Sequence, residues 1–439
     1  MVDVDQTSQQ QDADCSKQGS SRGPSRRAVL IGTGAAGALT ALPALPAQAA
    51  TDHGGGSNGG RGPTAFVTTR GAGFRLGRKP FRFSGTNIYY LHQQSHYMID
   101  AALDDAAAMG LRVVRAWAFA DGTEKSAKPL QPEPYTYDDE ALDSLDYAVW
   151  KAGQVGLRLV LTLTNNWPDY GGMQQYVSWF LGLEDDSYAD AVNHDRFYTT
   201  EAIQRCYRAW VRHIVRRRNP YTGKRYANDP TIMTFELANE PRNRSDKSGK
   251  TLLRWADETS RFVKGLAPHQ LVALGDEGFY GRTGTSDYPY SDGEGNHWLD
   301  LTALRAIDYG TVHVYPQHWG GDAAADPVGW GTRWISDHLA DARRLGKPVV
   351  IEEYGLNVGD GAKVPDEAAR TAGYRAWTHA VEQGRGSDQF WLLTSRVDDG
   401  SFYADYDGYR MTWNADASNP VRDTVAVLSA HARALLESS

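Results

Sequence analysis

Two glutamates that follow short apolar segments are the residues best placed to carry out chemistry. Glu240 lies shortly after the apolar segment 231–237, and Glu353 ends the apolar segment 348–353. Cleavage of a glycosidic bond requires a pair of carboxylates. One carboxyl must be protonated so that the leaving oxygen can depart, and the other must be ionised so that it can attack or stabilise an oxocarbenium-like centre. The two glutamates therefore predict glycosidase chemistry, provided that the fold brings them together.

Other polar and aromatic residues stand on neighbouring apolar segments and could surround the carboxylates. Arg115, His313, Tyr315 and Trp391 each lie on or at the end of a segment of strand length. His313 and Tyr315 are two residues apart, so on a strand they share one face. A cation, an imidazole, a phenol and an indole are the groups that can orient carboxylates and carry a sugar ring.

Eight apolar segments of strand length alternate with amphipathic stretches along the chain. The predicted strands are 81–88, 112–119, 157–164, 231–237, 270–274, 309–315, 348–353 and 389–394. The predicted helices are 99–109, 141–154, 201–218, 252–266, 330–345, 367–382 and 425–436, with a short candidate at 301–307. Several helical stretches end on a glycine, as helix C-termini often do.

This alternation predicts a (β/α)8 TIM barrel that forms a single catalytic domain over residues 64–439. The strands are apolar on both faces, as parallel strands covered by helices must be. In such a barrel the chemistry lies at the C-terminal ends of the strands, where strands four and seven would present Glu240 and Glu353. A doubly wound open sheet is the alternative, but no GxGxxG motif follows the first strand.

The first 49 residues are typical of a twin-arginine-type signal region. Arg26 and Arg27 precede a Gly/Ala-rich apolar run to about Leu45, and a small-x-small cleavage site ends at Ala49. The run is too short and too rich in glycine for a stable membrane span. We expect the region 1–49 to be removed after export and the stretch 50–63 to be a flexible linker. A disordered tail with a chance arginine pair is the alternative.

The composition excludes several classes of partner. Lys and Arg number 46 and Asp and Glu number 54, which gives a formal net charge of −8. Such a chain lacks the positive surface that nucleic acid or an anionic membrane needs. Trp (13) and Tyr (23) are abundant, which indicates stacking surfaces. Because Cys15 lies in the leader, Cys206 is alone in the mature chain, and no internal disulfide is expected.

His92 and His96 are four residues apart and could form a metal-binding pair on a helix. They follow the first strand in a Gln-rich stretch, and no third ligand is evident in the sequence. We interpret both as loop residues on the substrate side of the barrel. No metal and no other cofactor are expected.

Short motifs that occur in order between about residues 66 and 413 give a more specific interpretation. They are Gly85-Thr86-Asn87, Arg115-Ala116-Trp117-Ala118-Phe119, Leu163-Thr164-Asn165-Asn166-Trp167, Tyr170-Gly171-Gly172, Glu236-Leu237-Ala238-Asn239-Glu240-Pro241-Arg242, Glu277-Gly278-Phe279-Tyr280-Gly281, His313-Val314-Tyr315-Pro316 and Glu353-Tyr354-Gly355. With these motifs the chain resembles the family 5 glycoside hydrolases, which are (β/α)8 enzymes, and within that family the endo-β-1,4-mannanases.

The resemblance implies a role for each matching residue. Glu240 matches the acid/base and Glu353 the nucleophile, while Asn239 matches the residue that bonds the 2-hydroxyl of the sugar. Trp391 matches the platform under the −1 sugar. Arg115, His313 and Tyr315 match the residues that surround and orient the carboxylates. The resemblance also implies retention of configuration, for which the carboxyls should lie about 5–5.5 Å apart.

Further sugar subsites are expected on four residues of the loops that follow the strands. Asn166, Trp167, Arg242 and Trp319 are candidates, with tryptophan stacking on sugar rings and arginine donating to hydroxyls. Ordinary loop packing is the alternative for them.

Electrostatics should give the two catalytic glutamates different protonation states. Arg115 near Glu353 would lower the pKa of Glu353, and Tyr315 could donate a hydrogen bond to it. Glu240 must be partly protonated near neutral pH, which burial and the neighbouring negative charge would favour.

Two further glutamates compete with these candidates. Glu236 lies in the fourth predicted strand, and Glu352 lies beside Glu353. Both are expected to be buried structural acids paired with a barrel arginine such as Arg112.

Together these features predict a secreted, retaining endo-β-1,4-mannanase. It would cut internal bonds of mannan, glucomannan or galactomannan by double displacement, as a monomer exported by the twin-arginine route. An exo-β-mannosidase, a β-1,4-glucanase and a non-catalytic polysaccharide-binding barrel are the alternatives. The chain has Tyr89-Tyr90 where relatives usually have Tyr-Trp, and Leu392 where many have Gln. Both departures lie near the distal glycone subsites.

Overall fold

Eight parallel strands form the centre of the computed structural model, which describes residues 62–123, 126, 128–183, 191–359, 361–414, 416 and 418–438. The strands are β4 (Ser84–Asn87), β5 (Val113–Trp117), β6 (Arg158–Thr162), β7 (Ile232–Glu236), β8 (Leu271–Ala273), β9 (Gly310–Val314), β10 (Val349–Tyr354) and β11 (Ser387–Phe390). They pair in the order β8-β7-β6-β5-β4-β11-β10-β9. The two outer strands of this order are joined as well, since Asp308 N–H donates to Val272 O (2.8 Å) and His313 N–H to Glu277 O (3.0 Å). The predicted (β/α)8 barrel is confirmed.

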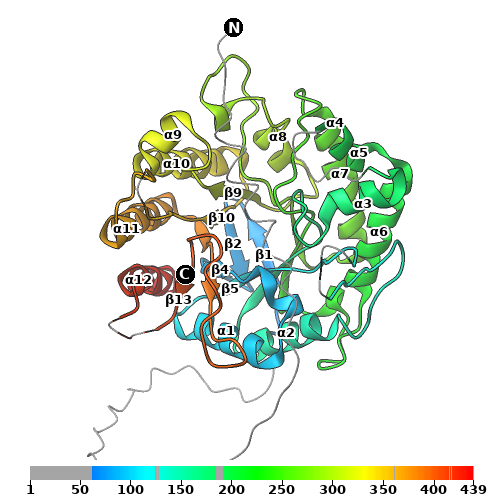
Figure 1. Cartoon of the computed structure of the whole chain (residues 1–439), viewed down its shortest axis with the longest axis horizontal. Helices are drawn as coiled ribbons and strands as arrows, with labels where there is room; N and C mark the ends of the chain where they lie inside the picture. Colours follow the sequence, from blue (N-terminus) through cyan, green and yellow to red (C-terminus); the bar gives the residue numbers. More distant parts are fainter. Residues whose placement is uncertain are drawn as a thin grey trace, which may run out of the picture. The chain divides into compact units, whose positions relative to one another are not determined.

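Each strand is followed by at least one helix on the outside of the barrel (Figure 1). The helices are α1 (His96–Ala108), α2 (Asp143–Gln154), α3 (Gly172–Leu181), α4 (Ala191–His194), α5 (Arg196–Thr199), α6 (Glu201–Arg216), α7 (Lys250–Leu266), α8 (Trp298–Ala303), α9 (Gly321–Ala325), α10 (Pro327–Leu345), α11 (Glu367–Gly384) and α12 (Arg422–Glu437). Short 3-10 turns add η1 (Tyr89–Gln93), η2 (Tyr226–Asn228) and η3 (Tyr288–Tyr290). Among the described residues, no helix combines the length and apolar character that crossing a bilayer would need.

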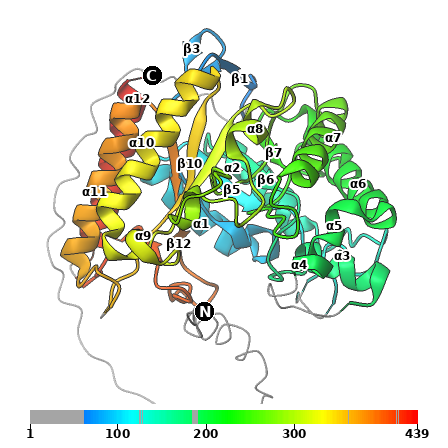
Figure 2. The ribbon, with the colours of Figure 1, turned by 90° about the horizontal axis from the view of Figure 1, so that it is seen from above.

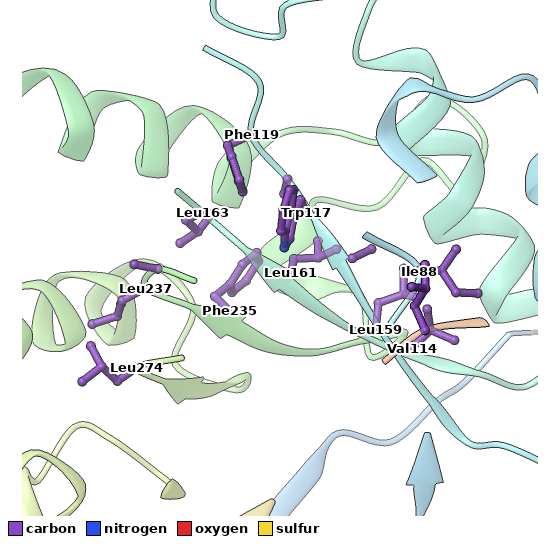
Figure 3. Packing of buried hydrophobic residues seen from close by; sticks show 14 of the residues in the cluster. Ile88, Val114, Trp117, Phe119, Leu159, Leu161, Leu163, Phe235, Leu237 and Leu274 are labelled. Atoms are coloured by element: carbon purple, nitrogen blue, oxygen red, sulfur yellow. The ribbon is translucent and has the colours of Figure 1, made fainter. Parts of the chain in front are cut away.

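Strand residues alternate between the barrel interior and the helices, as the two-residue period of a strand requires. On β5, Val114 and Ala116 belong to the large core cluster that includes the helices, whereas Val113 belongs to a separate cluster inside the barrel. Figure 3 shows members of the large cluster, among them Leu161 and Phe235, on neighbouring strands. Arg115 points inward by the same alternation and is fully buried.

A small antiparallel sheet closes the N-terminal end of the barrel. It comprises β1 (Val67–Arg70), β2 (Gly73–Leu76) and β3 (Lys79–Pro80), and Figure 2 shows it at the end of the barrel away from α9 and β12 (Leu393–Thr394). Phe74 and Phe81 pack in the inner cluster with side chains from the bottoms of the barrel strands. This sheet was not predicted from the sequence. It leaves the C-terminal ends of the strands as the end where a substrate can enter.

The last helix, α12, is anchored to the barrel by a buried histidine. Nδ1 of His431 lies 2.6 Å from Oε1 of Glu382 on α11, and Nε2 lies 3.2 Å from Oδ2 of Asp388 on β11. Burial lowers the pKa of His431, but the charges and hydrogen bonds of Asp388 and Glu382 outweigh it and raise the pKa to about 8. The imidazolium therefore stabilises the fold at neutral pH.

We expect a stability change with pH that depends on His431. Because the pKa is raised from 6.5 to about 8, folding is favoured by about 2 kcal/mol below pH 6.5, and this contribution is lost as the pH rises through 8. His431→Gln should flatten the free energy of unfolding between these pH values, as urea titrations would measure. His379→Gln, at an exposed position of α11, should keep the wild-type slope. An unchanged slope in His431→Gln would contradict the assignment.

Candidate active site

The segment after β7 is held in place by neighbouring strands and presents Glu240 at the mouth of the barrel. The backbone N–H groups of Leu237 and Ala238 donate to the last residue of β8 and to the residue after it, and that of Asn239 donates to Thr164 O beyond β6. Glu240 itself has a φ of +48°, the left-handed region that non-glycine residues seldom occupy. Such a conformation is stable only where the surroundings enforce it, and it is concentrated at functional sites.

A β-bulge on β10 determines where Glu353 points. Ile351 pairs with Val312 of β9, but the next pair is Glu353 with His313, so Glu352 is the extra residue. A bulge of this kind redirects the side chains that follow it. The hydroxyl of Tyr315 donates a hydrogen bond to Oε2 of Glu353 (2.9 Å), as the sequence predicts.

The two candidate catalytic carboxylates face each other across His313. One oxygen of Glu240, one oxygen of Glu353 and one ring nitrogen of His313 all lie within 4.8 Å of one another. Nδ1 of His313 lies 2.6 Å from Oε1 of Glu240 and 3.6 Å from Oε2 of Glu353. The side chain of Glu353 is buried, at 5% exposure, and that of Glu240 is 12% exposed. The predicted meeting of residues from strands four and seven is therefore observed.

Arg115 connects the candidate catalytic carboxylate of β10 to the interior of the barrel. Its guanidinium donates to Oε1 of Glu353, to Oε1 of Glu236 (2.6 Å from Nη2) and to the side-chain oxygens of Asn239 (2.8 Å) and Asn87 (3.1 Å). Asn239 in turn donates its Nδ2 to the side chain of Asn165 (3.0 Å). The amide of Asn239 thus has a fixed orientation.

The pKa shifts of the two glutamates run opposite to the prediction. Burial raises the pKa of Glu353, and the positive charges of His313 and Arg115 do not cancel that effect. Burial also acts on Glu240, but the hydrogen bond and charge of His313, with Arg242 and Trp167, lower its pKa to about 2. The prediction was wrong because it placed the cation beside Glu353 alone. The nearest cation of Glu240 is His313. Burial lowers the pKa of His313, but the surrounding carboxylates raise it well above 6.5.

Two tryptophans lie near the candidate site, Trp167 against Glu240 and Trp391 at the end of the eighth barrel strand. Nε1 of Trp167 donates to Oε2 of Glu240 at 2.5 Å. Trp391 directly follows β11, and its backbone N–H donates to Tyr354 O (3.0 Å). Its ring stacks on the ring of Tyr89, with the two ring planes 5° apart. A partly exposed indole at the end of a barrel strand is suited to carry a sugar ring.

The other predicted subsite residues make mainly protein contacts. Arg242 forms a bidentate ion pair with Glu277 (2.6 and 2.7 Å), and its guanidinium lies 5.0 Å from the ring centre of Trp167. Asn166 is buried and accepts the backbone N–H of Arg242 (3.3 Å). Trp319 is 9% exposed and packs within an aromatic cluster that includes Trp330 and Trp334. Contact of these residues with substrate stays a prediction.

Glu236 and Glu352 are buried acids, as predicted, but their arginine is Arg115 and not Arg112. Arg112 lies lower in the barrel, where it stacks over Phe81 and donates to Arg82 O (3.3 Å). The error has a simple reason, since Arg112 precedes the strand whereas Arg115 points inward from its middle.

The two histidines after the first strand lie in different environments. His92 is buried in η1 with Nδ1 3.2 Å from Tyr89 O, and burial lowers its pKa to about 4. His96 is exposed at the start of α1 and lies 2.9 Å from Asp143 of α2. The interpretation of both as loop residues was wrong, because the chain turns into helix directly after β4.

Sequence reasoning did not identify some residues that support the site. Asn87 donates to Glu352 O (2.9 Å) and accepts from Arg115, and Glu277 fixes the guanidinium of Arg242. Both lie within the motifs quoted above, so the signal was present. Tyr89 was noted in the sequence only as part of the Tyr89-Tyr90 departure and not as a contact of Trp391, and Asp407, which also contacts Trp391, carries no motif that would have revealed it.

Comparisons with known proteins agree with this geometry. Residues 64–384 match the family model described as GH family 5 β-mannosidase-like. Mannan endo-1,4-β-mannosidase 8 of Oryza sativa subsp. japonica is 34% identical over 374 residues, which cover 81% of this chain and 96% of that protein. The endo-1,4-β-D-mannanase of Thermotoga petrophila RKU-1 is 37% identical with a TM-score of 0.72, over 81% of this chain and 100% of that structure. The endo-1,4-β-mannanase of Rhizomucor miehei is 34% identical with a TM-score of 0.72, over 85% and 100%.

Proposed function

Because the chain belongs to glycoside hydrolase family 5, in its β-mannosidase-like group, we propose that it is a secreted, retaining endo-β-1,4-mannanase. The chain is a glycoside hydrolase, and the relatives that match most of its length are named as endo-acting enzymes on mannan. The substrate would be a mannan, glucomannan or galactomannan. The enzyme would act as a monomer.

The observation that carries the retaining mechanism is the short distance between the two carboxylates. Oxygens of Glu240 and Glu353 lie within 4.8 Å of each other, which suits the separation of about 5–5.5 Å in retaining enzymes and leaves no room for the water of an inverting one. In the first step Glu353 would attack the anomeric carbon of the −1 mannosyl residue while Glu240 protonates the departing oxygen. In the second step Glu240 would take a proton from a water molecule, and the water oxygen would attack the anomeric carbon and release Glu353.

His313 would supply the proton that Glu240 delivers. The pKa of Glu240 is lowered and that of His313 is raised, so we infer that this proton resides on Nδ1 of His313 before the reaction. Nδ1 is 2.6 Å from Oε1 of Glu240, so a move along one hydrogen bond charges the general acid. In the second step Glu240 takes a proton from water. This proton would then return to His313 along the same hydrogen bond. The side chains that donate hydrogen bonds to Glu353 are Arg115 and Tyr315, which keep their protons, and Nδ1 of His313 is farther from Glu353, at 3.6 Å.

Export is part of the proposal and rests on the sequence. The region 1–49 lies outside the described residues, as does most of the linker 50–63. Because this region has a twin-arginine pattern and a small-x-small cleavage site, we infer that it is cleaved off near Ala49 after export. Periplasmic or extracellular fractions of a producing cell should contain a chain that begins near residue 50, which N-terminal sequencing would identify.

Hydrolysis of mannohexaose and cellohexaose, followed by chromatography and by NMR of the first products, tests the proposed function. We expect mannohexaose to yield mainly products of two to four sugars, with the β-anomer formed first, and cellohexaose to react at least about 100-fold more slowly. Release of mannose alone would favour an exo-β-mannosidase, and preference for cellohexaose would favour a β-1,4-glucanase. Initial formation of the α-anomer would contradict the retaining mechanism.

A further inference from the structure

Trp391 is held by two contacts that fix both the height and the tilt of its indole ring. The ring of Tyr89 lies parallel to it, with the ring centres 5.2 Å apart and the planes at 5°. This stack covers one face of the indole. The indole Nε1–H, on the edge of the ring, donates to Oδ2 of Asp407 at 2.7 Å. The ring is thus supported both at one face and at one edge.

Asp407 is itself positioned by elements other than Trp391. Its Oδ1 accepts the backbone N–H of Tyr409 (3.0 Å), and its backbone oxygen accepts from Asn357, in the chain that follows β10 (3.3 Å). The next residue, Gly408, accepts from Arg370 of α11 (3.1 Å). The carboxylate is thus attached to the β10–α11 side of the barrel. It links the orientation of Trp391 to the elements that also carry Glu353.

From this geometry we propose that Asp407 is a positioning residue that sets the plane of Trp391 beneath the −1 sugar. The inference rests on the proposed function, in which Trp391 is the platform of that sugar. A ring that stacks on an indole must lie over its face, and the face must keep its angle while the sugar flattens toward the oxocarbenium-like transition state. Small errors in such placement are costly to rate.

The chemistry of the carboxylate explains why an aspartate serves here. Two N–H donors, from Trp391 and Tyr409, approach its two oxygens. An ionised carboxylate offers an acceptor to both, whereas an asparagine of the same shape must turn an N–H group toward one of them. Asp407→Asn therefore changes the support of Trp391 with little change in volume. Trp391→Phe removes the indole N–H and keeps an aromatic face.

The experiment is a double-mutant cycle on kcat/KM for mannohexaose. We expect Asp407→Asn to lower kcat/KM about tenfold, mainly through kcat, with an unchanged midpoint of thermal unfolding. In the Trp391→Phe background the same Asp407→Asn change should cost less than about twofold, because no N–H remains to be oriented. Asp405→Asn is the matched control. Asp405 lies in the same loop and accepts only the Gly408 N–H (2.9 Å) among the contacts described, so its variant should stay within about twofold of wild type.

Each result has a distinct meaning. An equal loss from Asp407→Asn in both backgrounds, or a lowered unfolding midpoint, would show a merely structural role and overturn the inference. Wild-type turnover in Asp407→Asn, while Trp391→Ala is impaired, would also overturn it and leave the platform intact. Wild-type turnover in Trp391→Ala would refute the platform, and with it this part of the proposed function.

Discussion

Replacing Glu353 with alanine should lower kcat on mannohexaose by about 10⁴-fold or more while leaving its binding measurable. Loss of a nucleophile removes the covalent step and not the contacts that hold the substrate, so turnover and affinity should separate. Isothermal titration with mannohexaose and a sensitive chromatographic assay would measure the two quantities. Glu201→Ala, at an exposed position of α6, should behave as wild type in both assays.

The variant should fold because the charges around Glu353 stay compensated. Arg115 keeps its ion pair with Glu236 and its hydrogen bonds to Asn87 and Asn239 after the carboxylate is removed. Far-UV circular dichroism should therefore match wild type. The loss of turnover in Glu353→Ala can be assigned to chemistry only with this circular dichroism control, because a buried arginine that had lost all its partners could unfold the chain.

A small anion gives a second, independent test of the same residue. Azide can enter the space left by the carboxylate and attack the anomeric carbon of an activated aryl β-mannoside. Glu353→Ala should then form the α-mannosyl azide, since one displacement inverts the configuration. Turnover near wild type without azide, or formation of a β-azide in this variant, would refute Glu353 as the nucleophile.

The barrel could be predicted from the sequence because its strands are buried on both faces. Predominantly apolar segments such as 157–164 and 231–237 stand out against the polar loops, and the structure has the strands Arg158–Thr162 and Ile232–Glu236 within them. The last strand was predicted at 389–394 but runs over Ser387–Phe390. The start of this strand was missed because its residues are polar. Asp388 is buried there in contact with Tyr354 and His431, which come from distant parts of the chain.

The antiparallel sheet β1–β3 and the small helices α3–α5 were missed for a related reason. These elements are short, and their burial depends on partners that a local pattern does not show. Phe74, for example, lies on a strand of four residues, and its ring is buried in the inner cluster at the bottom of the barrel. Periodicity over so few residues carries too little signal to separate a strand from a loop.

The positions of the catalytic candidates were predictable from motifs, but their electrostatics were not. His313 was expected to orient the carboxylates, which left open which of them it approaches more closely. In the structure Nδ1 lies 1.0 Å closer to Glu240 than to Glu353, at 2.6 against 3.6 Å. These distances depend on the local backbone geometry, such as the bulge that redirects the chain at Glu352, and no residue type in the sequence predicts that bulge.

Replacing Glu240 with glutamine should lower kcat/KM on mannohexaose by about 10³-fold, within the range that general acid catalysis contributes. The loss on an aryl β-mannoside with a good leaving group, such as dinitrophenolate, should be less than about tenfold. Glutamine fills the same volume and can still accept from Trp167, but it cannot pass a proton to a sugar oxygen. Because kcat/KM reports the first step alone, the comparison isolates the acid role from the later base role.

The pH profile of this variant distinguishes an acid from an electrostatic support. In wild type the proton shared by His313 and Glu240 is lost at high pH, so kcat/KM on mannohexaose should fall on the alkaline side. The aryl substrate needs no such proton, and with Glu240→Gln its profile should stay flat there. Azide should accelerate the second step of this variant and give the β-mannosyl azide, opposite to the product of Glu353→Ala. Equal losses on both substrates, or the same azide anomer from both variants, would contradict the assignment of Glu240 as the acid/base.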